Sequence, residues 1–187
     1  MTAMPTDAIW HPRARVVASP NCDARPLNTP ISLIVIHNIS LPPNRFGSDD
    51  VERLFTNRLI VERDPFFAEI AQLRVSSHFF IRREGELMQF VDCAKRAWHA
   101  GASVHRGRER CNDFSLGIEL EGTDTQAFTA KQYARCSRLV TWLAARFPID
   151  AIAGHSEIAP GRKTDPGPTF DWARLQRDAN VPAAWRR

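Results

Sequence analysis

The chain has 187 residues, of which 43% are hydrophobic and 25% are charged. This length allows one well-buried core and is short for two full domains. The net charge of +4 is mildly basic, which is too weak a bias to select nucleic acid over a small anionic molecule as partner. No apolar run approaches the ~18 residues of a membrane span. The N-terminal segment lacks the apolar region of a secretory signal, so we expect a cytoplasmic protein without membrane contact.

Four cysteines are present, and no two of them have the C-x-x-C spacing of redox and metal motifs. Without an export signal, the simplest expectation is that they are reduced, packed thiols.

The first predicted strand, Ile31–His37, is a nearly continuous run of apolar and β-branched residues. It follows a proline-rich lead-in, residues 1–30, that we expect to be irregular. Such a run is typical of a strand buried on both faces. Its last residue, His37, is well placed to enter a site, although taken alone it is better interpreted as a hydrogen-bonded core histidine.

A short helix and a hairpin are predicted next. Ser48 is the expected N-cap of a helix that extends to Phe55. Alternating apolar residues predict strands at Ser77–Arg82 and Glu86–Val91, with Glu84-Gly85 at the turn between them.

The polar segment Arg96–Cys111 is predicted to be a long loop, and a loop of this length in a compact chain is often functional. We therefore expect His99 and His105, which lie in it, to be near a substrate. His78 lies inside an apolar strand instead and is expected in the core.

A strand is predicted at 114–121, where apolar and other residues alternate. The alternation places Glu119, Glu121 and Gly117 on one face. Glu121 is expected to be solvated, and Gly117 is expected to leave room for a ligand beside Glu119.

The clearest helix prediction covers Thr129–Phe147, because apolar residues recur at intervals of three and four and Thr129-x-x-Gln132 fits a capping box. A short buried strand, Ala151–Gly154, then leads to His155, and Asp171 is expected to cap a final helix. Strands mixed with helices predict an α/β fold, a single domain with a central mixed β-sheet covered by helices.

The segment Gly154–Pro168 concentrates reactive groups in a loop stiffened by prolines. If it is extended, Lys163 and Asp165 face the same side. Together with His37 and His155, Asp165 makes a set of two imidazoles and one carboxylate, which is typical of a catalytic zinc site with a free fourth position. For an arbitrary K-x-D sequence, a salt-bridged surface loop is the alternative.

Several motifs in matching order resemble the N-acetylmuramoyl-L-alanine amidase family, most closely its cytoplasmic AmpD type. These motifs are Ile34-Val35-Ile36-His37-Asn38, Ser77-His78-Phe79-Phe80-Ile81, Trp98-His99-Ala100-Gly101, Asn112–Gly122, and Gly154-His155 with Lys163–Pro168. The resemblance covers roughly Val16 to Leu175. It implies the fold that peptidoglycan recognition proteins share with these amidases, with a core at about 16–175, a lead-in at 1–15 and a tail at 181–187.

The resemblance also implies roles for individual residues. It assigns the zinc ligands to His37, His155 and Asp165, the catalytic acid/base to Glu119 and a second catalytic role to Lys163. Substrate contacts carry over to Asn38, Arg74, Trp98 and Arg110.

The activity implied by the resemblance is hydrolysis of the amide bond between (1,6-anhydro-)N-acetylmuramic acid and L-alanine. It would serve cytoplasmic peptidoglycan recycling, which is linked to control of β-lactamase induction. The implied partner is an anionic muropeptide, and no protein partner is implied. A muropeptide-binding sensor on the same fold and an exported amidase are alternatives. A nucleic-acid binder would need clustered basic residues, and only Arg106–Arg110 approaches such a cluster.

Overall fold

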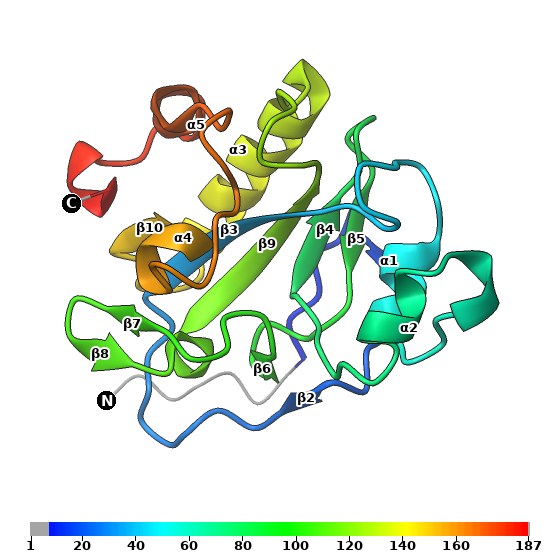
Figure 1. The fold of residues 1–187 in the computed structure, drawn as a ribbon. Helices are drawn as coiled ribbons and strands as arrows, with labels where there is room; N and C mark the ends of the chain where they lie inside the picture. The colour runs from blue at the N-terminus through cyan, green and yellow to red at the C-terminus, as the bar shows by residue number, and fades with distance from the viewer. Residues whose placement is uncertain (1–7, 187) are drawn as a thin grey trace.

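The computed structural model describes residues 8–186, and a six-stranded sheet lies at its centre (Figure 1). The strands follow the order β1-β5-β4-β9-β3-β10. Their bounds are Arg15–Val16 (β1), Leu87–Gln89 (β5), Phe79–Ile81 (β4), Ser115–Glu121 (β9), Leu33–Ile39 (β3) and Ala151–Gly154 (β10). β4 and β5 are antiparallel and the other neighbours are parallel. The predicted mixed sheet is therefore confirmed.

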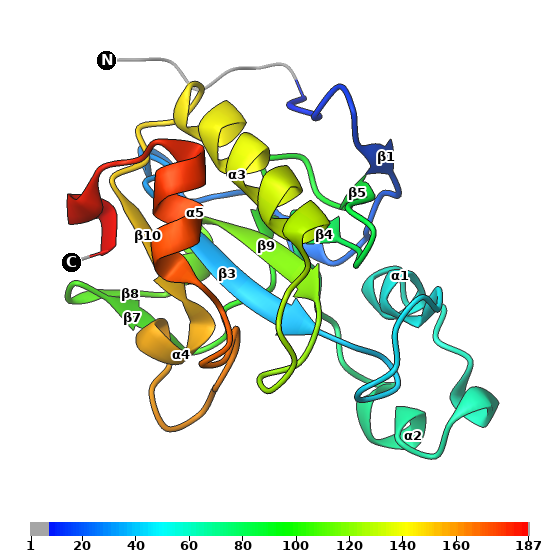
Figure 2. The ribbon, with the colours of Figure 1, turned by 90° about the horizontal axis from the view of Figure 1, so that it is seen from above.

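The helices lie on both sides of this sheet. They are α1 (Asp50–Phe55), α2 (Phe67–Ile70), α3 (Ala130–Ala144), α4 (His155–Ile158) and α5 (Trp172–Ala179), with short 3-10 turns at Val61–Arg63, Cys111–Asp113 and Ala183–Arg186. Figure 2 shows α3 and α5 side by side over one face of the sheet. No helix in the described part of the chain is long and apolar enough to cross a membrane.

Both predicted helix caps at Thr129 and Asp171 are confirmed. The Thr129 hydroxyl accepts the N–H of Gln132, and the Gln132 side chain accepts the N–H of Thr129 in return. This capping box starts α3. The Asp171 carboxylate accepts the N–H of Arg174 at 2.9 Å and starts α5.

The strand alternation decides which side chains face the core and which face the site. Ile36 and Ile118 point to the face that α3 and α5 cover, where they pack in one apolar cluster with Leu139 and Leu175. Because successive side chains of a strand point to opposite faces, the residues that follow them, His37 and Glu119, point to the other face. α1 and α2 cover part of that face with a second apolar cluster.

The predicted cap at Ser48 is wrong. α1 begins at Asp50, and its N-cap is Asp49, whose side chain makes no capping hydrogen bond. The Asp49 carboxylate is instead engaged by the guanidinium groups of Arg53 and Arg63, each at 2.7 Å. The Ser48 hydroxyl reaches only the N–H of Asp50 and donates to the Leu41 carbonyl.

Two segments predicted to be irregular contain short strands. β1 lies in the lead-in, and Cys22–Asp23 (β2) pairs with Arg96–Ala97 (β6). The predicted loop over residues 96–111 also contains a small hairpin, in which Val104–His105 (β7) pairs with Arg108–Glu109 (β8). Strands of two residues are too short to produce the period-two pattern from which strands are predicted. Residues 1–7 of the lead-in lie outside the described residues.

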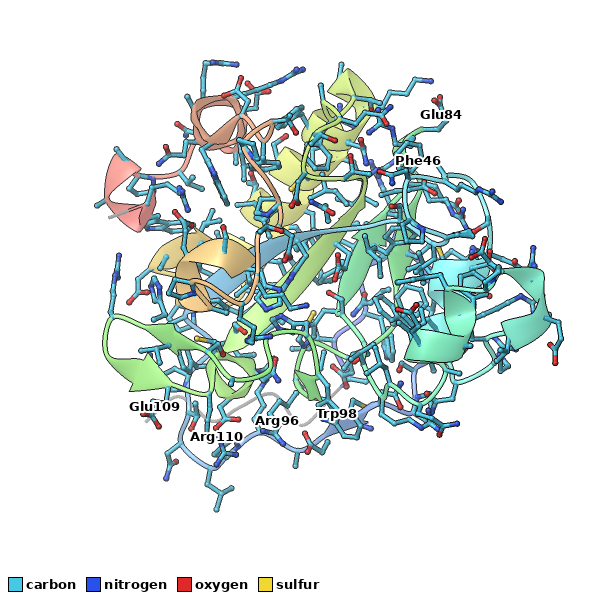
Figure 3. The ribbon with its side chains drawn as sticks, in the orientation of Figure 1. Phe46, Glu84, Arg96, Trp98, Glu109 and Arg110 are labelled. Atoms are coloured by element: carbon cyan, nitrogen blue, oxygen red, sulfur yellow. The ribbon has the colours of Figure 1, made fainter. Side chains whose placement is uncertain are left out.

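Glu121 is buried, not solvated as predicted. It is 3% exposed, and its carboxylate accepts the N–H groups of Gly47 at 2.6 Å and Arg83 at 3.0 Å. Two loops fold over this end of β9, and their side chains Phe46 and Glu84 lie near one another in Figure 3. Glu121 therefore accepts hydrogen bonds from two backbone N–H groups that would otherwise be buried in these loops without an acceptor.

Candidate metal centre

Three neighbouring strands bring the candidate ligands together. His37 on β3 pairs in register with Glu119 on β9, and Ile36 pairs with Gly154, the last residue of β10. His155, the residue after Gly154, therefore stands beside His37 at the same end of the sheet. The backbone carbonyl of Asp165 accepts the N–H of Ser156 at 2.9 Å, which holds the following loop against the start of α4.

The three side chains converge on one point. The Nδ1 atoms of His37 and His155 lie 3.0 Å apart, and Asp165 Oδ2 lies 3.0 Å from the first and 3.1 Å from the second. With zinc–ligand bonds of about 2.0–2.1 Å, the edge of a tetrahedral site measures roughly 3.3 Å. A triangle of ligand atoms with this size would suit three of the four ligands of a tetrahedral zinc site.

The charge states also suit a metal. Burial lowers the pKa of His37 to about 4, so its imidazole is neutral and keeps a lone pair for coordination. Burial acts to raise the pKa of Asp165, but the bonds from His155 and His37 outweigh it and hold that pKa below its usual range. The site thus combines two imidazoles with an ionised carboxylate, the donor set of a catalytic zinc centre.

Glu119 stands beside these ligands with an unused oxygen. The residue is 8% exposed, and its Oε2 atom is buried without a hydrogen-bond partner among the described residues. Burial, and then the charge of Asp165, raise its pKa well above the usual value, while Lys163 acts in the opposite direction. A carboxyl group with a raised pKa that faces a cavity is suited to take up and return a proton.

A cavity of about 250 Å³ opens onto these groups. Its lining combines polar side chains, which include His37, Glu119, His155, Asp165 and Lys163, with apolar side chains, which include Leu54, Phe55, Phe66 and Ile70. A more open groove of about 620 Å³ shares Asn38, Lys163 and Asp165 with it. The site can therefore receive a ligand that has both polar and apolar parts.

The predicted substrate contacts fall into two groups. Asn38 and Trp98 line the cavity, and the Asn38 amide donates to Asp124 at 2.7 Å. Arg74 and Arg110 are not among its lining residues. The Arg74 guanidinium donates to carbonyl groups of its own turn, and that of Arg110, 68% exposed, pairs with Asp113. Figure 3 shows Arg110 at the lower edge of the molecule, next to Glu109.

The room beside Gly117 is taken by His99, not by a ligand as predicted. A Cβ atom at Gly117 would lie 2.7 Å from Cγ of His99 and 2.8 Å from the Ser77 hydroxyl. His99 lines the cavity, and its Nδ1 atom lies 2.9 Å from Nε2 of the candidate ligand His37, a contact that the loop prediction missed. The glycine did signal a close approach, but only the tertiary structure identifies the approaching group. His78 is buried as predicted, while His105 does not line the cavity.

Residues 27–168 match the profile of the family described as N-acetylmuramoyl-L-alanine amidase. The chain belongs to this family. The 1,6-anhydro-N-acetylmuramyl-L-alanine amidase AmpD of Salmonella typhimurium strain SL1344 is 55% identical over 172 residues, which are 91% of this chain and 92% of the relative. The predicted assignment as an amidase enzyme of the AmpD type is thereby confirmed.

Solved structures agree with the family assignment. The crystal structure of a Se-Met AmpD derivative matches with a TM-score of 0.90 and 52% identity, over 96% of this chain and all of that one. The amidase AmiD of Escherichia coli, solved with the substrate anhydro-N-acetylmuramic acid-L-Ala-D-gamma-Glu-L-Lys, matches with a TM-score of 0.60 and 28% identity, over 89% of this chain and 60% of that one. The Drosophila peptidoglycan recognition protein PGRP-LB shares the fold with a TM-score of 0.60 at 17% identity, over 89% of this chain and 90% of that one. The predicted fold is confirmed.

Proposed function

We propose that this chain is a zinc-dependent amidase that hydrolyses the bond between 1,6-anhydro-N-acetylmuramic acid and the L-alanine of a peptide stem. The observation that carries the proposal is the triangle of ligand atoms from His37, His155 and Asp165, with the unpartnered carboxylate oxygen of Glu119 beside it. The names of the AmpD relatives and the substrate bound to AmiD support this choice of bond.

His37, His155 and Asp165 would hold the zinc ion. When bound there, zinc supplies a water whose pKa is lowered to about 7 and a Lewis acid that polarises a carbonyl group.

Glu119 is the proton carrier of the proposed reaction. Its Oε2 atom accepts a proton from the attacking water and returns it to the nitrogen of the leaving L-alanine. The return step matters because an amine is a poor leaving group as an anion. The burial that raises the pKa of Glu119 makes its carboxylate a stronger base and keeps bulk water away from the transferred proton.

Lys163 provides the positive charge for the oxyanion of the tetrahedral intermediate. It lines the same cavity as Glu119, and its charge acts on both Glu119 and His37. Lys163 is exposed to solvent, and a positioned cation of this kind stabilises the negative charge that develops on the substrate oxygen.

The substrate would lie along the cavity and the open groove. Trp98 offers a flat apolar wall for the sugar, and Asn38 offers an amide at the junction of the two spaces. Roles of Arg74 and Arg110 in binding carboxylates of the peptide stem remain predictions, because neither lines the cavity in this structure. The net charge of +4 favours an anionic muropeptide.

We place this activity in cytoplasmic peptidoglycan recycling. All four cysteines are free, and three of them are buried, which is the usual state in a reducing compartment. The link to control of β-lactamase induction remains a prediction. The alternative is a sensor that binds muropeptides without cleaving them. Such a sensor would not need a buried carboxylate oxygen without a hydrogen-bond partner, as Oε2 of Glu119 is.

Mass spectrometry of the protein incubated with anhydro-N-acetylmuramyl-L-Ala-D-gamma-Glu-L-Lys tests the proposal. We expect separate anhydro-sugar and tripeptide, with cleavage lost on chelation and restored by zinc. Intact substrate at full zinc occupancy would favour the sensor. Cleavage that survives complete removal of metal would overturn the zinc mechanism.

A further inference from the structure

The ring of His37 has a partner on each side. Its Nδ1 atom faces His155 and Asp165, and its Nε2 atom lies 2.9 Å from Nδ1 of His99. The rings of His37 and His99 meet edge to face, with 5.0 Å between their centroids and an interplanar angle of 87°. The imidazole of His37 is thus held between the ligand triangle and a second imidazole.

This arrangement allows only one distribution of protons when Nδ1 of His37 is a ligand. A neutral imidazole carries one N–H, so coordination through Nδ1 places it on Nε2, which then donates to Nδ1 of His99. His99 must in turn carry its own hydrogen on Nε2, which lies 3.2 Å from the Ser115 hydroxyl. The chain of donors and acceptors runs from His37 through His99 to Ser115.

Gly117 makes this contact possible. It lies on β9 between Ser115 and Glu119, and a Cβ atom there would overlap the His99 ring at 2.7 Å from Cγ and 2.8 Å from Nδ1. Its φ does not lie in the left-handed region, so the backbone itself does not require glycine. The space above Gly117 is needed for the imidazole.

The backbone around His99 is itself held in place. The N–H groups of His99 and Ala100 both donate to the side-chain oxygen of Asn112, at 3.1 and 2.8 Å. The carbonyl of Ala100 lies 3.2 Å from Nε2 of His155, the second candidate ligand. The segment His99-Ala100 therefore supplies the acceptor for the Nε2–H of both candidate ligands. The His99 side chain accepts from His37, and the Ala100 carbonyl accepts from His155.

We propose that His99 is a positioning residue that sets the tautomer and ring orientation of His37 for metal binding, and that Gly117 is required because it admits the His99 ring. The proposal rests on the zinc site of the proposed function. Hydrogen-bond partners of ligand histidines orient the ring and raise its basicity, and their loss typically costs about 10- to 100-fold in metal affinity or activity.

Zinc affinity, measured by chelator competition, tests the role without depending on turnover. His99→Phe keeps a ring but offers no acceptor, so we expect zinc to bind about 10- to 100-fold more weakly. His99→Gln offers a side-chain carbonyl and should recover part of the loss. Gly117→Ala retains the imidazole but displaces it, and should weaken zinc binding like His99→Phe.

Gly122→Ala is the matched control for Gly117→Ala. A Cβ atom at Gly122 would crowd the Phe128 ring at 2.5 Å, so this variant reproduces a clash beside the same strand away from the metal site. We expect it to lower stability and to leave zinc affinity unchanged. NMR of the histidine ring nitrogens in the zinc-free protein provides a second readout, because His37 should carry its hydrogen on Nε2 in the wild type and lose this preference in His99→Phe.

The outcomes separate the two proposals. Wild-type zinc affinity and an unchanged His37 tautomer in both His99→Phe and Gly117→Ala would overturn the positioning role and leave the amidase proposal intact. Absence of zinc binding by the wild-type protein would overturn the zinc site itself. Equal losses of zinc affinity in Gly117→Ala and Gly122→Ala would mean that a general loss of stability weakens zinc binding, and this result would also overturn the role of His99.

Discussion

His37 and Glu119 are direct partners in the parallel register of β3 and β9. Parallel neighbours present their side chains to the same face, so one backbone pairing sets a candidate ligand next to the candidate proton carrier. Neither residue needs a flexible loop to reach the site, and groups held on packed strands keep their geometry better than groups on loops.

Glu119→Gln should abolish turnover while zinc remains bound. The amide has almost the same shape but cannot carry the proton, and general acid–base catalysis contributes about 10²–10⁴ in rate. The measurement is kcat together with the zinc content of the purified variant. Near-wild-type kcat would remove Glu119 from the mechanism.

The raised pKa of Glu119 also predicts how the stability of the metal-free protein depends on pH. The folded state holds this proton more tightly than the unfolded state, whose glutamate titrates near pH 4.5. Stability conferred by the protonated form is complete below that pH and is lost as pH rises through the folded pKa. Urea unfolding in chelator should therefore show Glu119→Gln gaining stability over the wild type as pH rises from about 4.5. An advantage that is independent of pH would contradict the raised pKa.

Asp165→Ala should lose zinc affinity, because two imidazoles alone make a weak site. Asp124→Asn is a suitable control for zinc content, since Asp124 lies in the neighbouring groove and is not a candidate ligand. Metal analysis after dialysis against a weak chelator gives the readout. Full zinc occupancy in Asp165→Ala would place the third ligand elsewhere.

Arg74 and Arg110 can be tested through the substrate's charge. If either arginine binds a carboxylate of the peptide stem, its replacement by alanine should raise KM for the free acid and leave KM for the carboxamide form unchanged. Trp98→Ala should raise KM for both forms, because a contact between the Trp98 ring and the sugar does not depend on the charge of the peptide stem. Equal KM increases for the two stems in Arg74→Ala or Arg110→Ala would exclude a carboxylate contact for that residue.

Glu121→Ala should destabilise the fold without affecting catalysis. It leaves the N–H groups of Gly47 and Arg83 without their acceptor, at a cost of about 1–3 kcal/mol for each buried group. Glu121→Gln retains one oxygen acceptor and should cost less. The measurements are the free energy of unfolding and the kcat of the folded protein. A loss of kcat in a fully folded variant would indicate that Glu121 has a catalytic role.

The sequence by itself determined the main elements and the candidate ligands. A continuous apolar run predicted β3, periodicity and a capping box predicted α3, and the motifs around His37 and His155 indicated the family. These features are local: each depends on residues close in sequence, whose preference for strand, helix or cap is strong enough to survive in the folded chain.

Only the tertiary structure decided which segments far apart in the sequence contact one another. The burial of Glu121 depends on two loops that close over β9, and the two-residue strands depend on partners far along the chain. The role of His99 depends on a space that Gly117 opens on another strand. Such contacts are set by the packing of the whole molecule, so no local pattern encodes them, and they decide which polar residues serve the site and which serve the fold.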